Sequence, residues 1–85
     1  MSQSSKLALE VVSEDHITPY DRAHMATYLS LLHASGEGLT LDEMARAILG
    51  LDPKTDPDGA RAITENHLAR ARWLATTGRK HLLEI

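Results

Sequence analysis

The sequence predicts an all-α fold, a three-helix, helix-turn-helix-like domain. Three stretches open with residues that start helices and continue with apolar residues at helical spacing, and glycines at positions 36, 38 and 50 separate them. The chain of 85 residues also has the length of one small domain, so we assign residues 1–85 to a single unit. We expect residues 1–5 to be disordered, as chain ends often are.

The first expected helix runs from Pro19 to about Ala34. Thr18 is a suitable N-cap, because Pro19 follows it at the first helical position and the acid Asp21 stands three residues after it. The face that we expect to be buried carries Met25, Tyr28, Leu29 and Leu32.

Residues 7–12, LALEVV, precede this helix and alternate with a period of two. Such alternation is typical of a strand, so it predicts a short N-terminal extended segment that lies on the domain. Because a lone strand needs a partner, the alternative is a flexible arm that becomes ordered only against the helices or against another protein.

Two further helices follow. The second begins after Thr40, which has Glu43 three residues on in a capping-box arrangement, and it ends at Gly50. The third is the longest, with Asp56 as its N-cap and with Gly78 expected to close it in a left-handed conformation. The second helix is expected to bury Leu41, Met44, Ala45 and Ile48.

The third helix has two faces of different composition. At about 100° per residue, its predicted core face is made of Ala60, Ile63, Thr64, Leu68, Ala71, Leu74 and Ala75. The opposite side carries a second stripe of Ala62, Asn66, Ala69 and Trp73. After the helix, we expect a short final turn that packs over the domain through Leu82, Leu83 and Ile85.

Residue types that support catalysis or metal binding are missing or unsuitably spaced. There is no cysteine, and no two of the five histidines are three or four positions apart, as ligands on one helix face would be. His67 lies at the edge of the predicted core face, which favours a hydrogen-bonded core or boundary histidine. No nucleophile elbow, phosphate loop or carboxylate pair is recognisable. We therefore expect no enzyme activity, no cofactor or metal, and no small-molecule ligand.

The sequence also lacks the signals of a membrane or secreted protein. No apolar run approaches the roughly 20 residues of a membrane helix, and the first residues, MSQSSK, lack the apolar core of a signal peptide. We expect a cytoplasmic protein with no membrane partner.

The formal net charge of −3 is unevenly divided, because residues 1–58 are acidic and residues 59–85 are basic. Groups that could meet DNA phosphates are Arg61, Arg70, Arg72, Arg79 and Lys80. However, the first turns of the third helix carry the acids Asp58 and Glu65. Asn66 is the one residue in these turns whose side chain is well suited to reading bases. This pattern argues against DNA binding, and a small helix-turn-helix DNA-binding regulator or excisionase-like factor is the alternative.

The second stripe is where we place a binding function. A tryptophan beside small residues and flanked by Arg70 and Arg72 has the composition of a protein-binding hot spot. Asp58 and Glu65 would add an acidic rim that selects a basic partner. The alternative is that a chain end covers the tryptophan within the monomer. The candidate partner-binding residues are Asp58, Ala62, Glu65, Asn66, Ala69, Arg70 and Trp73.

The second and third helices together also carry a family resemblance. The stretch GLTLDEMARAILG, followed by a long helix that ends in RARWLATTGRKHLLEI, resembles the C-terminal part of a helix-turn-helix family first described as a domain of unknown function. This family occurs in transcriptional regulators of proteobacterial integrative and conjugative elements. The N-terminal LALEVV is similar to it as well.

The resemblance implies an antiactivator that works by protein–protein interaction. Its implied partners are a LuxR/TraR-type quorum-sensing regulator and an FseA-like activator of the same family, and its implied effect is to repress excision and conjugative transfer of a mobile element. DNA-binding relatives carry more arginine along the third helix, and Glu65 departs from that pattern. Both occupation of an activator's protein-binding surface and engagement of its basic DNA-reading face are compatible with the sequence.

Overall fold

Residues 16–78 are described in a computed structural model of the chain, and within this range every regular element is a helix. The elements are α1 (Pro19–Ala23), α2 (Met25–Gly36), α3 (Leu41–Ala47), α4 (Pro57–Trp73) and the π-helical turn η1 (Leu74–Gly78). The predicted all-α class is confirmed. The predictions for residues 1–5, 7–12 and 79–85 lie outside the described residues.

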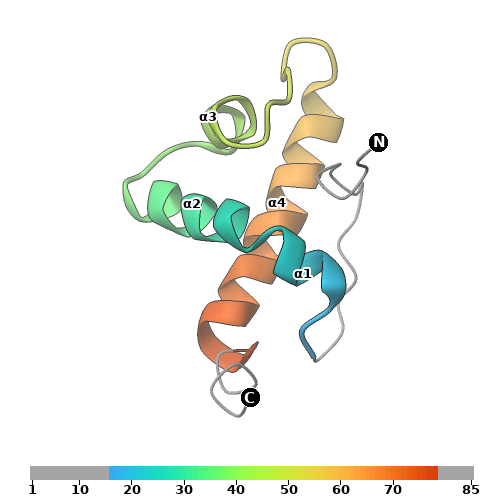
Figure 1. The fold of residues 1–85 in the computed structure, drawn as a ribbon. Coiled ribbons are helices and arrows are strands. Elements are labelled where there is room, and N and C mark those ends of the chain that lie inside the picture. Colours follow the sequence, from blue (N-terminus) through green and yellow to red (C-terminus); the bar gives the residue numbers. More distant parts are fainter. Residues whose placement is uncertain (1–15, 79–85) are drawn as a thin grey trace.

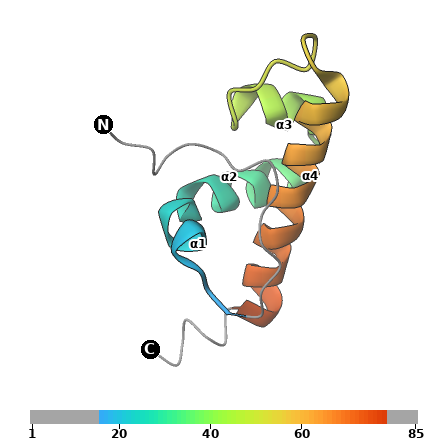
Figure 2. The same cartoon turned by 90° about the vertical axis from the view of Figure 1, so that its right-hand side faces the viewer.

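α4 is the longest helix, and α2 and α3 both pack against it. Figures 1 and 2 show α4 running along the molecule, with α3 against its first half, α2 across its middle, and α1, α2 and α3 all on one side. No other helix of residues 16–78 covers the opposite side (Figure 2). Within the same range, no helix combines the length and the apolar character that crossing a bilayer requires.

Side-chain caps begin the helices where the sequence predicts them. The Asp21 N–H donates to Thr18 Oγ1 at 3.1 Å, and Thr18 N–H donates back to Asp21 Oδ2 at 3.0 Å. Thr40 and Glu43 form the same reciprocal pair at the start of α3. At α4, Asp56 Oδ1 accepts from the N–H of the third helical residue at 3.1 Å.

The first helix is not continuous, which corrects the prediction of one helix from residue 19 to about 34. The backbone leaves the helical conformation at His24, where φ is −115° and ψ is 22°. The break turns α1 so that Tyr20 and Asp21 reach α4, as described below. At the other end, α2 continues to Gly36 and closes in a Schellman motif. Gly38 has a φ of 88°, and the Leu39 N–H donates to the Ala34 carbonyl oxygen.

α2 is also rotated relative to the prediction. Leu29, expected inside, is 62% exposed, whereas Leu31 is fully buried together with Tyr28. The helix packs on both α3 and α4, so its buried face is centred on the residues that point between them. The sequence MATYLSLLHASG contains no formally charged residue to mark an outer face. Periodicity alone therefore could not orient this helix.

Two apolar clusters hold the helices together. One joins α2, α3 and α4 through Leu31, Ala34, Met44 and Leu68, and the other joins α2 to the end of α4 through Tyr28, Ala71 and Leu74. The predicted core face of α4 is confirmed along the helix, although Ile63 is only half-buried. Ala75 is exposed, contrary to the prediction, and it lines an open hollow beside α2. Gly78 is the last residue of that turn, and its predicted left-handed conformation stays a prediction.

Candidate functional site

A buried ion pair fastens α1 to α4. The side chains of Asp21 and Arg70 are 0% and 5% exposed, and Arg70 Nη2 donates to Asp21 Oδ2 at 2.6 Å. The same Nη2 donates to the His16 carbonyl oxygen at 2.7 Å. Asp21 also accepts from the Tyr28 hydroxyl at 2.9 Å and from Thr18 N–H at 3.0 Å. Both carboxylate oxygens are therefore hydrogen-bonded, which offsets the cost of removing the charges from water.

These hydrogen bonds determine which groups of the cluster are ionised. Burial alone would raise the pKa of Asp21, but the hydrogen bonds that it accepts, first among them that from Arg70, hold this pKa below its ordinary value. Burial and the hydrogen bond to the carboxylate raise the pKa of the Tyr28 hydroxyl. Asp21 is thus an anion and Tyr28 a neutral donor at neutral pH.

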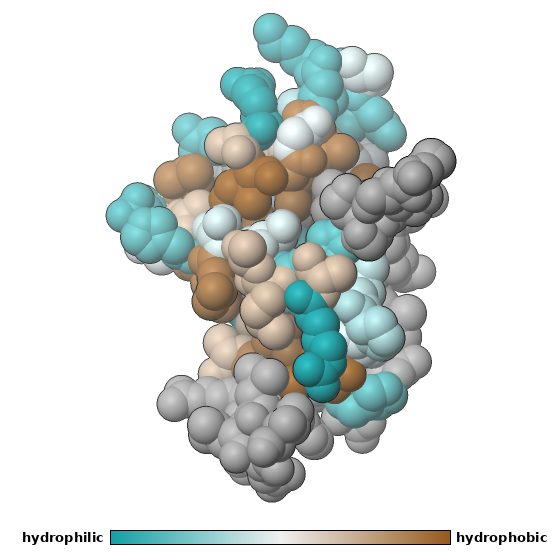
Figure 3. All heavy atoms as spheres, in the orientation of Figure 1, coloured by the Kyte–Doolittle hydropathy of each residue, from teal (hydrophilic) through white to brown (hydrophobic). Residues whose placement is uncertain are grey.

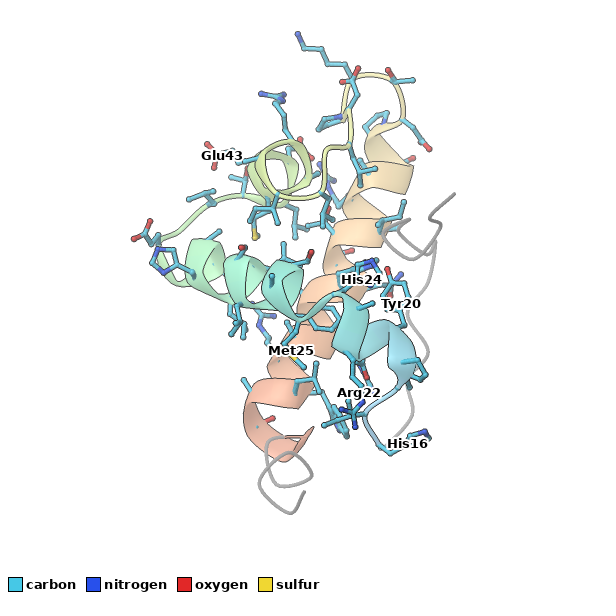
Figure 4. All side chains as sticks on the ribbon, viewed as in Figure 1. His16, Tyr20, Arg22, His24, Met25 and Glu43 are labelled. Carbon is cyan, nitrogen blue, oxygen red and sulfur yellow. The ribbon has the colours of Figure 1, made fainter. Side chains whose placement is uncertain are left out.

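His67 lies one turn earlier on the same helix and is completely buried. Its Nδ1 is 2.7 Å from the Ile63 carbonyl oxygen, which can only accept, so this nitrogen carries the proton. Its Nε2 accepts from the Tyr20 hydroxyl at 2.6 Å. Tyr20 in turn stacks on His24, and Figure 4 shows the two side by side near α4. Burial, opposed in part by the Ile63 hydrogen bond, lowers the pKa of His67. The prediction of a hydrogen-bonded core or boundary histidine is confirmed, and the structure places it in the core.

Most of the predicted partner-binding residues lie on the uncovered side of α4. We call Asp58, Ala62, Glu65, Asn66 and Ala69 the outer face of α4. Asn66 is half-buried and the other four are exposed. The exposed four follow one another at intervals of four, three and four residues, which places them along one line of the helix. α2 and α3 pack on the opposite face of the helix, where Thr64, Leu68 and Ala71 are buried, and Figure 2 shows α1, α2 and α3 on one side of α4.

Arg70 does not lie on this surface, which corrects its place in the predicted binding set. It is 6% exposed and bound to Asp21. The signal that could have placed it is the helical projection. At about 100° per residue, Arg70 falls beside Ile63 at the edge of the core face, roughly 120° from Asp58.

Trp73 is divided between the core and the surface. Its side chain is half-buried and packs against the cluster of Tyr28, Ala71 and Leu74. The guanidinium carbon of Arg70 lies 4.2 Å from the centroid of its ring, within the range of a cation–π contact. Trp73 is therefore tied to the fold at the end of the outer face. The alternative prediction was that a chain end covers Trp73, and both chain ends lie outside the described residues.

The basic residues of α4 do not form a continuous positive track. Arg70 is buried, and Arg61 Nη2 lies 3.7 Å from Asp42 Oδ1 at a half-exposed position. Arg72 is exposed and donates to Ser35 Oγ at 3.2 Å. Two of the three arginines of α4 thus have a carboxylate partner within the molecule.

A second surface, which the sequence did not indicate, surrounds Leu29 on α2. A hollow of about 450 Å³ lies on one side of Leu29, between α2 and α3, and another of about 190 Å³ lies on the other side, between α2 and the end of α4. Figure 3 shows apolar residues gathered in the upper middle of the face that carries α2 and α3, with hydrophilic residues at its top and left edges and one long hydrophilic side chain across its lower middle. Besides Leu29, the apolar residues that line the hollows are Met25, Leu32, Ala34, Leu39, Ile48, Ala71, Leu74 and Ala75.

Across residues 16–78, no three metal-ligating side chains come together in a geometry that could hold an ion. No protein-family model matches the chain, and no curated protein matches it at a significant level.

Proposed function

We propose that this chain is an antiactivator, similar to the small antiactivator QseM, which binds transcriptional activators through the outer face of α4. The activators in this proposal are a LuxR/TraR-type quorum-sensing regulator and an FseA-like activator of the same helix-turn-helix family. Binding would keep them from switching on excision and conjugative transfer of a mobile element. The proposal places this activity in the cytoplasm.

The observation that carries the proposal is the composition of the outer face of α4. In a helix-turn-helix protein that binds DNA, the equivalent surface of the long helix would enter the major groove with basic and amide side chains. Here it carries the acids Asp58 and Glu65 in line with Ala62 and Ala69, all exposed. Alanines allow a partner helix to approach closely, and the acids favour a basic partner. The surface therefore suits a protein better than a phosphate backbone.

The alternative, a DNA-binding regulator or excisionase-like factor, has less support from the geometry. Among the described arginines of α4, Arg70 is committed to Asp21 and Arg61 is paired with Asp42. An acidic outer face would repel DNA phosphates at close range. A DNA complex would therefore depend on Arg72 and on residues outside the described range.

The test is a heteronuclear NMR titration of the isotope-labelled chain at near-physiological salt. One series adds a purified LuxR-type activator, a second adds an FseA-like activator, and a third adds duplex DNA. We expect an activator to shift or broaden the amide signals of Ala62, Glu65 and Ala69, and we expect DNA to leave them unchanged. Ala69→Arg places a large cation in the middle of the surface and should weaken activator binding at least about tenfold.

The matched control is Leu29→Arg, which makes a similar apolar-to-cationic change on α2, and it should leave activator binding unchanged. Saturable, salt-sensitive shifts with DNA on α4 would overturn the proposal in favour of the DNA-binding alternative. Activator binding that Ala69→Arg leaves intact would keep the antiactivator role but exclude this surface.

A further inference from the structure

We propose that the face of α2 around Leu29 is a self-association surface, on which a second copy of this chain packs about a two-fold axis. This surface is separate from the outer face of α4, and the inference does not depend on the antiactivator proposal. Leu29 is the one large apolar residue within residues 16–78 whose side chain is exposed, at 62%. Because Leu29 stands between two hollows lined mostly by apolar residues, it belongs to a contiguous apolar patch, and such a patch indicates an interaction surface.

The shape of the surface favours a second copy because it presents a protrusion and a matching hollow side by side. Leu29 forms the ridge between the two hollows and lines both of them. In a two-fold symmetric pair, each copy can place its Leu29 in a hollow of the other, so one contact is made twice. Leu39 and Ile48 on one side, and Leu32 and Leu74 on the other, supply apolar walls for the inserted side chain.

The charge distribution also favours self-association on this face. Two copies that each carry a formal charge of −3 repel one another, and contact through acidic surfaces such as the outer face of α4 would add to that repulsion. α2 contains no Asp, Glu, Lys or Arg over its 12 residues. At the rim, His33 Nε2 lies 3.3 Å from Glu37 Oε2 at an exposed position. Two copies can therefore meet along α2 with Glu37 as the one formally charged residue among those that line the two hollows.

The size of the surface indicates a weak, reversible dimer. α2 is about 18 Å long at 1.5 Å per residue, and the hollows extend the apolar face over α3 and η1. An interface at the small end of the specific range, about 1,200 Å² in total, would cover roughly a tenth of the 5645 Å² surface of each copy. We expect a dissociation constant on the order of 100 µM.

The test is sedimentation equilibrium of the full chain over a concentration series from about 10 µM to about 1 mM. The weight-average mass should rise from 9.3 kDa toward twice that value. In parallel NMR spectra, the amide signals of Leu29, His33 and Leu74 should move with concentration. Leu29→Arg should raise the dissociation constant at least about tenfold. Because Leu29 is largely exposed, this variant should fold, which far-UV circular dichroism checks.

Ala69→Arg is the matched control and should leave the dissociation constant unchanged. A wild-type mass that stays at 9.3 kDa up to the highest concentration overturns the proposal without any variant. A dimer that Leu29→Arg leaves intact, or that Ala69→Arg disrupts, also overturns it, because self-association would then use another surface. Since activator binding is measured separately on α4, either proposal can fail while the other stands.

Discussion

Arg70 and Asp21 form a charge pair that is buried in a domain with few residues to spare for a core. Two nitrogens of Arg70 donate hydrogen bonds to the Asp21 carboxylate. The Tyr28 hydroxyl and the Thr18 N–H donate to the same carboxylate, which stabilises its charge further. Removing one partner would leave the other charge buried and uncompensated. The two residues are 49 positions apart in the chain, so their pairing could not be read from local pattern.

The buried pair of Asp21 and Arg70 should be important for the stability of the fold. Arg70→Met should lower the free energy of unfolding by about 3–5 kcal/mol, because Asp21 then remains buried without its counter-charge. Arg72→Met is the control two positions along the same helix. It removes one hydrogen bond at an exposed position and should change stability by no more than about 0.5 kcal/mol. Urea unfolding of the variants measures both values, and similar losses in the two would contradict the role of the buried pair.

His67 should make the stability of the fold depend on pH. Because its pKa in the folded state lies below the unfolded value of about 6.5, the unfolded chain binds the proton more readily. Its contribution to stability is therefore present above about pH 6.5, is lost as the pH falls toward the folded pKa, and changes no further below it. NMR titration of the His67 ring should give a midpoint below about 6.5.

Unfolding measured across the same pH range checks the consequence for stability. His67→Gln should flatten the loss of stability below about pH 6.5, whereas His33→Gln, at a side chain 77% exposed, should leave it in place. A His67 midpoint at or above the ordinary histidine value would contradict the prediction.

At the scale of the element, helix starts could be predicted from sequence because caps are local. Thr18 with Asp21, Thr40 with Glu43, and Asp56 each satisfy backbone N–H groups within four residues. The break at His24 could not be predicted, because its cause is distant. α1 turns away from α2 to bring Tyr20 to His67 and Asp21 to the buried arginine of α4.

The N-cap of α4, Asp56, should be energetically coupled to Gly59. A Cβ atom added at Gly59 would overlap the Asp56 carboxylate that caps this helix. Gly59→Ala gains about 1 kcal/mol from helix propensity but displaces a cap of about the same worth, so we expect little net change in the wild-type background. In an Asp56→Ala background, the same substitution should stabilise the protein by about 1 kcal/mol.

Urea unfolding of the four proteins completes a double-mutant cycle, with an expected coupling of about 1 kcal/mol between Asp56 and Gly59. An equal gain in both backgrounds would show that the capping carboxylate moves aside at no cost.

At the scale of the whole molecule, the sequence predicted one of the two exposed surfaces. The outer face of α4 was predictable because the spacing of charged and apolar residues along this helix separates its buried side from its exposed side. The surface around Leu29 was not, because an uncharged helix looks equally apolar all round. Its orientation is decided by packing on α3 and α4, where Leu31 and Tyr28 are buried and Leu29 is left outside.

The division of α4 into a core face and an outer face has a consequence for how such a protein can change over generations. Asp58, Ala62, Glu65 and Ala69 belong to neither apolar cluster, so substitutions there alter the exposed surface of the helix with little effect on the fold. Thr64, Leu68 and Ala71 are held by packing and have no such freedom. Under the proposed function, recognition can therefore diverge rapidly among descendants of this chain while the scaffold stays the same.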